Sequence, residues 1–412
     1  MAIIAAVLAA LFMGPVMLHA AESAGLAGLI AEAAANNPEL LSMRERVRAA
    51  EAGARASGNL EDPTLKMEMM DLSSRHAASF GPGNAMETRY MLSQAIPFPG
   101  KLSLEEKMAS KEAAATRGDL ASKTLDIAAF VKEAYFDYAF LDASQRINNE
   151  VRELLAEMAR IAESRYSTGL APQQDVIRVH IEESMLTGEG LSIAAGMEAA
   201  SARLKYILGR QQDSVLDITP ELPVTRVEFS TSGLIEKAVV NNPAIRSMAD
   251  SVGAAEAASE LSRKAYYPDL MAGAGPVQRD GKFDTYDVML QINIPIWFGK
   301  TSNRSEEASA AAAAMRSRLM AEQNIRALEV KQAAIDVETA DRMLSLYSTG
   351  ILPQALIGFE SALKNYQSGK IDFLTLIETE RTLKTARLDY IRTLLDYRKK
   401  VAALERAVGE DF

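Results

Sequence analysis

The sequence offers one small group of soft metal ligands. Met67, Met69, Met70 and Met91 lie in two stretches that alternate as strands do, and His76 lies between the stretches. Thioether sulfurs together with an imidazole suit copper(I) or silver(I). Met67 and Met69 share one strand face, however, where methionine commonly serves as apolar filling. We therefore interpret this group as packing and retain Met67, Met69 and His76 as weak candidates for metal ligands.

The rest of the chain offers little for catalysis. The 412 residues include no cysteine and only three histidines, which excludes thiolate metal sites and leaves too few nitrogen ligands for a zinc hydrolase. No nucleophile paired with a base and no phosphate-binding loop stands out. The formal net charge of −10 argues against a nucleic-acid partner and suits a cation. The sequence predicts a protein that is not an enzyme and uses no cofactor.

A repeated pattern organises the chain. NNPELLSMRERVRAAEAGARASGNLEDPTL starts at Asn36, and NNPAIRSMADSVGAAEAASELSRKAYYPDL starts at Asn241 in the same register without a gap. SQAIPFPGKL in the first half is answered by INIPIWFGKT, and RYSTGLAPQQDVI is answered by NYQSGKIDFLTLI. Such self-similarity indicates a tandem duplication. We predict a first repeat over 22–210, a linker over 211–230 and a second repeat over 231–412.

The first residues have the composition of a leader. An apolar run through Leu18 is followed by the small residues Ala20 and Ala21, which predicts a signal peptide over 1–21, although no Lys or Arg precedes the run. The alternative is an N-terminal membrane anchor. No later stretch approaches the about 18 to 20 apolar residues that a membrane helix needs. A membrane-spanning protein of this sequence must therefore use strands.

Each repeat has the same order of predicted elements. Helical periodicity over 23–59 and 231–265 is followed by strand hairpins over 64–97 and 269–296. In the last strand the apolar residues alternate with Asp287, Met289, Gln291 and Asn293, a pattern typical of a membrane β-barrel strand. Four strands cannot close a barrel, so other copies must supply strands, and three copies would give twelve.

The strand hairpins lead into very long helical hairpins, predicted over 101–208 and 300–408. The stretch from Lys101 to Gly169 contains no proline and, before its end, one glycine. At about 1.5 Å per residue it corresponds to roughly 100 Å of helix. Gly350 and Pro353 are expected to break or kink the second long helix. Gly169 and Gly369 are expected to allow the tight reversals at the tips.

The repeated corner and tip motifs, together with the duplication, resemble the TolC-like outer-membrane efflux proteins of Gram-negative bacteria. The motifs are most similar to those of outer-membrane components of heavy-metal tripartite pumps, and the resemblance covers about residues 23–411. It implies an α+β, mostly α fold: a trimeric 12-stranded outer-membrane β-barrel continued by a 12-helix periplasmic α-barrel. It also implies a passive exit duct for small molecules or metal cations. The implied partners are a periplasmic adaptor (membrane fusion protein) and an inner-membrane transporter.

The resemblance also implies where function lies. Adaptor docking is expected at the tips, on Tyr166, Gly169, Leu170, Tyr366 and Gly369. Candidates for a periplasmic gate are Asp175, Asp372 and Glu378, because threefold symmetry would make each acid facing the lumen a cation-attracting ring. Thr375 stands where the family's first acid of the second hairpin is expected. The alternative interpretation is that these acids only solvate the surface or cap helices.

The corner motifs are interpreted as structural: they end a strand and start a helix, and they take no part in transport. Prolines there end strand pairing, glycines allow the bend, and lysines enter the first helical turn. The corner residues are Pro97, Gly100, Lys101, Pro295, Gly299 and Lys300.

Two other classes of protein share some of these features. A periplasmic coiled-coil adaptor without a membrane barrel would explain the hairpins and the leader, but it needs a lipoyl-like β domain that no segment here provides. A passive porin unconnected to a pump would not need such long hairpins.

Overall fold

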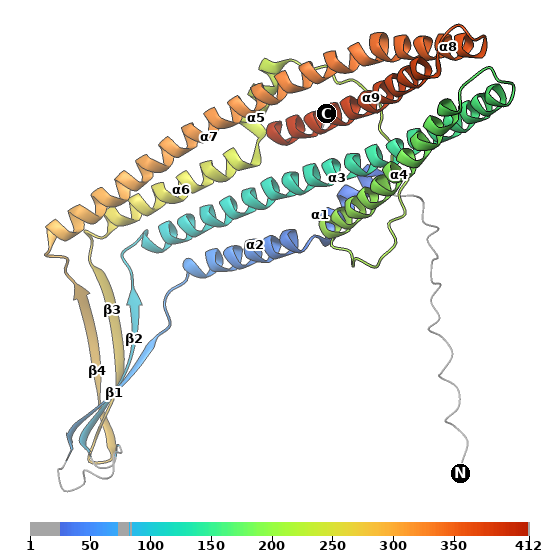
Figure 1. The fold of residues 1–412 in the computed structure, drawn as a ribbon. Helices are drawn as coiled ribbons and strands as arrows, with labels where there is room; N and C mark the ends of the chain where they lie inside the picture. Colours follow the sequence, from blue (N-terminus) through green and yellow to red (C-terminus); the bar gives the residue numbers. More distant parts are fainter. Residues whose placement is uncertain (1–24, 73–81, 83–84, 411–412) are drawn as a thin grey trace, which may run out of the picture. The chain divides into compact units, whose positions relative to one another are not determined.

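The computed structural model describes residues 25–72, 82 and 85–410 (Figure 1). The predicted signal peptide and His76 lie outside the described residues. The fold is mostly helical with antiparallel strands, as the sequence predicts. No helix among the described residues is long and apolar enough to cross a membrane. In chain order the elements are α1 (Leu26–Asn36), α2 (Pro38–Ser57), β1 (Thr64–Leu72), β2 (Ala85–Ile96), α3 (Lys101–Ser167), α4 (Gln173–Leu208), α5 (Thr231–Asn241), α6 (Pro243–Lys264), β3 (Asp269–Arg279), β4 (Lys282–Asn293), α7 (Phe298–Leu346), the π-helix η3 (Tyr347–Ile351), α8 (Leu352–Gln367) and α9 (Phe373–Val408).

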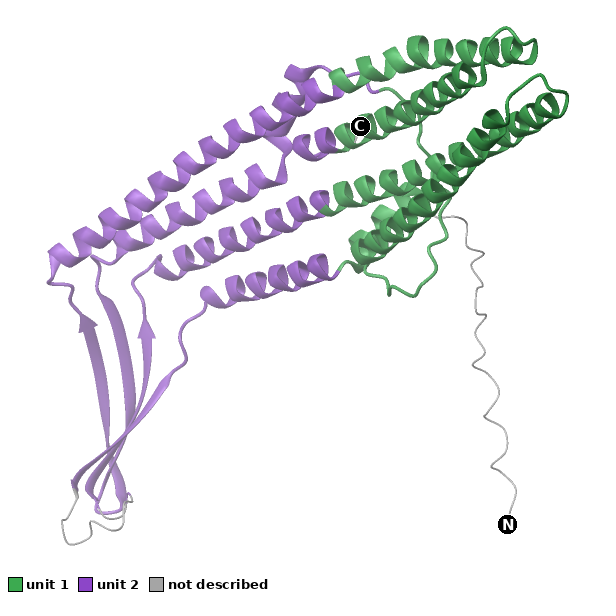
Figure 2. Ribbon diagram, in the orientation of Figure 1, with its two compact units in different colours: residues 1–37, 127–226, 338–402 green, residues 38–126, 227–337, 403–412 purple. Residues whose placement is uncertain are grey.

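The chain divides into two compact units (Figure 2). Unit 1 comprises residues 1–37, 127–226 and 338–402, and unit 2 comprises residues 38–126, 227–337 and 403–412. Each unit takes segments from both halves of the sequence, and α3, α7 and α9 contribute residues to both units. The strands belong to unit 2, and both tip turns belong to unit 1.

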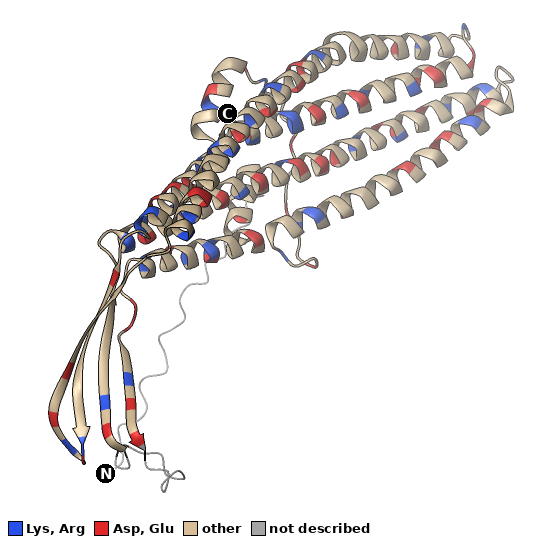
Figure 3. Ribbon diagram, turned by 90° about the vertical axis from the view of Figure 1, so that its left-hand side faces the viewer, with Lys and Arg blue, Asp and Glu red and all other residues tan. Residues whose placement is uncertain are grey.

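The strands form one antiparallel sheet in the order β1-β2-β3-β4. Directly paired residues point to the same face, so the register separates two faces. One face is apolar and exposed: its members include Leu65, Met67, Leu92, Ala274, Val288 and Leu290. The opposite face carries charges of both signs, mostly toward the turns (Figure 3): Lys66, Glu68, Glu87, Arg89, Arg279 and Asp287. The alternation predicted for β4 is present up to Asn293, where the strand ends.

Two local features fix the sheet. Asp280 and Gly281 link β3 to β4 with φ of 45° and 77°, the left-handed pair that suits a two-residue hairpin turn. In β3, a Cβ at Gly275 would lie 1.6 Å from the carbonyl oxygen of Tyr90. The backbones of β2 and β3 therefore approach so closely that only glycine fits at this position.

The first corner follows the sequence prediction closely. Gly100 has a φ of 90° and turns the chain between β2 and α3. Lys101 opens α3 and contacts both oxygens of Asp269, at 2.7 and 2.8 Å from its Nζ. The backbone N–H of Phe98 donates to the same carboxylate at 2.8 Å. This corner is therefore held by a charge-assisted hydrogen-bond network that joins α3 to the start of β3.

The second corner differs from the prediction. α7 already begins at Phe298. Lys300 lies in its first turn, as predicted, but Gly299 lies within the helix and does not make the bend. Farther along, the expected interruption at Gly350 and Pro353 takes the form of η3. Pro353 falls in the first turn of α8, directly after η3. The helical path continues through a π turn, with no break in the chain's helical course.

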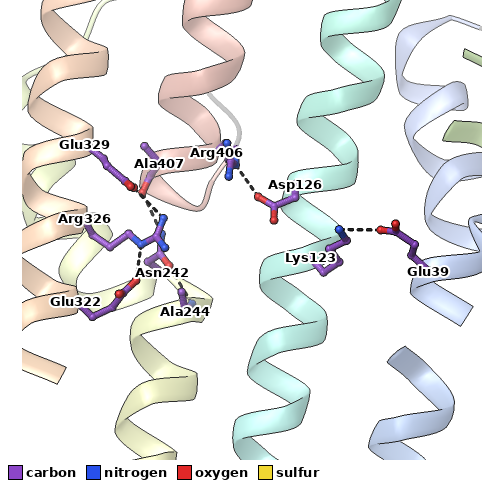
Figure 4. A network of polar contacts seen from close by, with 10 residues as sticks. All are labelled: Glu39, Lys123, Asp126, Asn242, Ala244, Glu322, Arg326, Glu329, Arg406 and Ala407. Carbon is purple, nitrogen blue, oxygen red and sulfur yellow. Dashed lines mark hydrogen bonds and ion pairs between the residues drawn. The ribbon is translucent and has the colours of Figure 1, made fainter. Parts of the chain in front are cut away.

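The Asn-Asn-Pro motifs divide what the sequence suggested were single helices. Pro38 and Pro243 start α2 and α6, and the asparagine before each proline is buried. Asn37 Nδ2 donates to the Ile207 carbonyl at 2.8 Å. Asn242 Nδ2 donates to the Ala407 carbonyl at 3.0 Å (Figure 4). The two repeats thus use the same residue to satisfy the end of a return helix, whose last carbonyls lack helical partners.

Ion pairs link neighbouring helices of unit 2 (Figure 4). Lys123 of α3 contacts Glu39 of α2 at 2.7 Å, and Arg406 of α9 contacts Asp126 of α3 at 2.6 Å. These side chains are partly exposed, so each pair contributes at most about 1 kcal/mol. Their main effect is to fix which helix faces lie together.

Unit 1 contains a hydrophobic core drawn from α3, α4, α8 and α9. Leu155, Met158 and Leu376 are among its fully buried members. This core lies directly behind both tip turns, because Tyr366 and Phe373, which flank the second turn, belong to it. The tips are therefore packed ends of helices with a shared interior.

Candidate functional site at the helical tips

The two tip turns have the same backbone geometry. Gly169 and Gly369 have φ of 73° and 74°, the left-handed conformation predicted for them. The N–H of each glycine donates to a tyrosine carbonyl three residues earlier, at 2.9 Å in both turns. The N–H of the next residue donates to the residue five positions before it, at 2.8 and 2.9 Å. This is the Schellman pattern, which explains why glycine ends both outgoing helices.

The residues predicted to dock an adaptor divide into exposed and buried ones. Tyr166 and Leu170 are 47% and 69% exposed. Tyr366 is 1% exposed, its ring packs edge-on against Phe373 at 5.3 Å, and burial raises the pKa of Tyr366 to about 12. The Tyr366 side chain is thus part of the tip core. The tip surface is offered by Tyr166, Leu170 and the two glycine turns.

The three predicted gate acids occupy different environments. Asp175, in the first turn of α4, accepts a long hydrogen bond of 3.5 Å from the Tyr366 hydroxyl, and burial raises the pKa of Asp175. Asp372 accepts from Thr375, whose N–H lies 2.8 Å from Oδ1, and these bonds lower the pKa of Asp372. Asp372 is therefore the N-cap of α9. Glu378 is exposed on α9. Of the three, Asp175 makes the contact between the two hairpins.

Arg165 is a tip residue that the sequence analysis did not identify. Its Nη1 donates to the carbonyls of Tyr366 and Gln367 at 2.9 and 3.3 Å, and its Nη2 lies 3.4 Å from the carbonyl of Leu170. Its guanidinium also lies 5.0 Å from the centre of the Tyr366 ring. One side chain thus joins both turns. Its position beside the repeated tip tyrosine was visible in the sequence, but no local pattern revealed its partners two hundred residues away.

Glu380 is a second residue that the sequence analysis did not identify. Its side chain is 3% exposed, and Oε1 has no hydrogen-bond partner among the described residues. Burial raises the pKa of Glu380 to about 7, since desolvation disfavours the charged carboxylate. The sequence did hold a signal: Glu380 falls at helical spacing between Leu376 and Leu383, both core residues.

Two ion pairs between α4 and α9 flank this buried carboxyl. Arg381 pairs with Glu182, and Lys384 pairs with Glu189. All four charges act on Glu380: the two basic groups favour its ionised form, and the two acidic groups oppose it. Because the neighbouring charges are already paired with one another, burial dominates the behaviour of Glu380.

The methionines considered as metal ligands do not form one cluster. Met67 and Met69 pair with Tyr90 and Thr88 on the apolar sheet face, whereas Met70 and Met91 belong to the charged face. Among the described residues, no group of three or more His, Asp or Glu side chains could hold a metal ion. The original grouping, which also included His76, therefore does not describe a site.

Comparison with known proteins identifies the family. A family model described as outer membrane efflux protein matches residues 29–210 and 234–410. The cobalt-zinc-cadmium resistance protein CzcC of Cupriavidus metallidurans is 21% identical over 403 residues, which cover 96% of this chain and 90% of CzcC. Two solved structures share the fold. The outer membrane protein VceC of Vibrio cholerae has a TM-score of 0.79 and 19% identity, with 95% of this chain and 97% of VceC covered. CusC, described in connection with transmembrane channel formation, has a TM-score of 0.77 and 17% identity, with 93% and 92% covered.

These matches confirm the resemblance drawn from the corner and tip motifs. They also explain why the sequence offers no catalytic constellation, since the family consists of efflux channels. The chain belongs to the outer membrane efflux protein family, and its place in the cell is the outer membrane.

Proposed function

We propose that this protein is the exit duct of a tripartite efflux pump, a homotrimer that conducts its cargo passively across the outer membrane. The observation that carries the proposal is the four-stranded sheet with one exposed apolar face and one charged face. Val288 and Leu290 of β4 are 85% and 69% exposed. Apolar side chains this exposed are unfavourable in water and favourable in the hydrocarbon of a membrane. The same feature argues against a periplasmic adaptor, which has no use for a lipid-facing sheet.

Further copies of the chain would cover the two open sheet edges and an exposed apolar stripe on α4. β1 and β4 are the edges of the sheet, and open edges are not tolerated in hydrocarbon. Three sheets of four strands would close a barrel of twelve. On α4, Ile177, Ile181 and Met185 form an exposed apolar stripe at helical spacing, 50%, 53% and 61% exposed. Such a stripe calls for a neighbouring helix, which an adjacent protomer would supply.

The tips would form the gate of this duct. Arg165 and the Asp175 to Tyr366 contact hold the two turns of each protomer together. Glu378 and the cap residue Asp372 are exposed there, so threefold repetition would place carboxylates around the opening and favour cations. Cations also suit the net charge of −10 and the similarity to a cobalt-zinc-cadmium resistance protein. We therefore propose heavy-metal cations as cargo.

The exposed tip surface would receive the periplasmic adaptor. Leu170 is an apolar side chain at the end of a helical hairpin, and a partner would bury it together with Tyr166 and the backbone at Gly169 and Gly369. An inner-membrane transporter would provide the energy, since nothing in the site described above performs chemistry. The protein itself would only provide the path.

Site-specific cross-linking tests the proposal, because the chain has no cysteine of its own. Leu170→Cys, cross-linked in intact cells, is expected to capture the adaptor encoded with the pump. Val215→Cys is the matched control, since Val215 is 82% exposed in the segment after α4 and away from the tips. In cells that lack this protein, metal ions should accumulate, and the parent chain should restore export. Equal capture from both positions, or unchanged accumulation, would contradict the proposal.

A further inference from the structure

Three methionines from three neighbouring strands surround one glycine on the charged face of the sheet. Gly273 of β3 is paired with Met289 of β4 and with Ser93 of β2. Met271 lies two residues before Gly273 on the same strand, so its side chain points to the same face. Met91 lies two residues before Ser93 on β2 and shares that face as well. The register therefore places Met289 directly opposite Gly273, and Met91 and Met271 two residues to either side of it along the sheet.

The position of the Met91 sulfur shows that this space is used. A Cβ built at Gly273 would lie 3.1 Å from Met91 Sδ, so the thioether leans across β3 and lies above the glycine. Met289 is directly opposite the same glycine. Strands are about 4.8 Å apart, which is within the reach of a methionine side chain. Because Gly273 has no side chain, open space remains above the β3 backbone, and the three thioethers can converge there.

Polar and charged residues share this face with the three methionines. Gln291 pairs with Met271, Ser93 pairs with Gly273, and Asp287 precedes Met289 by two residues on the same side of β4. Water-facing positions of a channel strand are normally polar. Thioether sulfur is a soft ligand that selects copper(I) and related ions. The nearby Asp287 carboxylate lies 3.5 Å from Arg89 Nε, so the thioethers themselves would select the ion.

We propose that Met91, Met271 and Met289 form a thioether site for a soft monovalent cation, silver(I) or copper(I). The site is built within one chain, so it exists whether or not the protein forms a pore. Its meaning for transport rests on the proposed function, which turns the charged face toward the channel. In that setting the site would be a contact for soft cations on their way out, repeated in each protomer.

Silver(I) titration of the purified, detergent-solubilised protein in chloride-free nitrate buffer tests the site. Methionine methyl groups labelled with ¹³C report which of the 19 methionines respond, and single Met→Leu variants assign them. The resonances of Met91, Met271 and Met289 are expected to shift together, with one silver ion per chain. Each of Met91→Leu, Met271→Leu and Met289→Leu should weaken silver binding at that site at least about tenfold, because even supporting residues of metal sites contribute that much.

Two comparisons make the result specific. Met67→Leu removes a thioether from the opposite, apolar face and is expected to leave the three shifts unchanged. Gly273→Ala adds a methyl group at the floor of the site and should displace the Met91 sulfur, which reduces the silver response. Independent shifts of the three methyls, or equal responses from Met67, would overturn the proposal. A site that binds silver in a protein without channel activity would refute the proposed function and leave the site standing.

Discussion

Glu380→Gln tests whether ionisation of the buried carboxyl behind the tips destabilises the helix packing as the pH rises. Burial raises the pKa of Glu380 from 4.5 to about 7, so the folded chain holds this proton more tightly than the unfolded chain does. The associated stability is fully present below about pH 4.5 and is lost as the pH rises through about 7. At about 1.36 kcal/mol per pKa unit, the loss amounts to about 3 kcal/mol. Glutamine has the same shape and no charge to lose.

Amide hydrogen exchange of residues 373–384, measured on the two proteins at the same pH, isolates this effect because the intrinsic exchange chemistry cancels. At pH 8 the glutamine variant is expected to exchange more slowly by up to about 100-fold. At pH 4.5 the two proteins should differ by about twofold or less.

The exposed Glu378→Gln is the matched control for removing a negative charge from the same helix, and its exchange should follow that of the parent chain at both pH values. The reasoning would be refuted by a difference between parent and Glu380→Gln that does not change with pH. It would equally be refuted by faster exchange in the glutamine variant at pH 8, because that result would mean that the ionised carboxylate stabilises the tip core.

Two further predictions concern the fold. Gly275→Ala places a methyl group against the Tyr90 carbonyl and should lower the free energy of unfolding by more than the about 1 to 3 kcal/mol typical of overpacking. We therefore expect the folded form, which runs differently from the heat-denatured chain on gels, to be lost. Gly299→Ala, in a helix with open space around it, should be neutral or stabilising by up to about 1 kcal/mol. Asn242→Ala removes both a helix cap and the bond to the end of α9, which should lower the free energy of unfolding by about 2 kcal/mol in urea. The exposed Asn241→Ala should cost under about 0.5 kcal/mol.

Much of the fold was predictable because its signals are local. The alternation in β4, the proline-free stretch of α3 and the glycines at the tips each depend on a few neighbouring residues, and the structure has strands, a helix and left-handed turns there. The glycine at position 299 was misjudged because its motif copies that of Gly100. At the second corner the helix α7 begins at Phe298, so the matching sequence motif there adopts a different backbone conformation.

The site was less predictable because its decisive contacts join distant residues. Asn37 and Asn242 marked the repeat, but their bonds to helix ends about 165 to 170 residues away follow only from the packing. The family resemblance placed Tyr366 among the docking residues at the tip, yet its side chain is buried in the core behind the tips. Arg165 stands beside the tip tyrosine in the sequence, but no local pattern predicts its bonds to the backbone carbonyls of the other hairpin.

Single-channel recording in a planar bilayer, with a reversal potential measured in a salt gradient, tests the central claim that this chain forms a gated outer-membrane duct. The account predicts a small, cation-selective conductance that increases in Arg165→Ala, which frees the two turns from each other. Arg160→Ala, an exposed arginine on the same helix, should leave the conductance unchanged. A protein that neither trimerises nor inserts, or one whose conductance ignores the tip variant, would contradict the account.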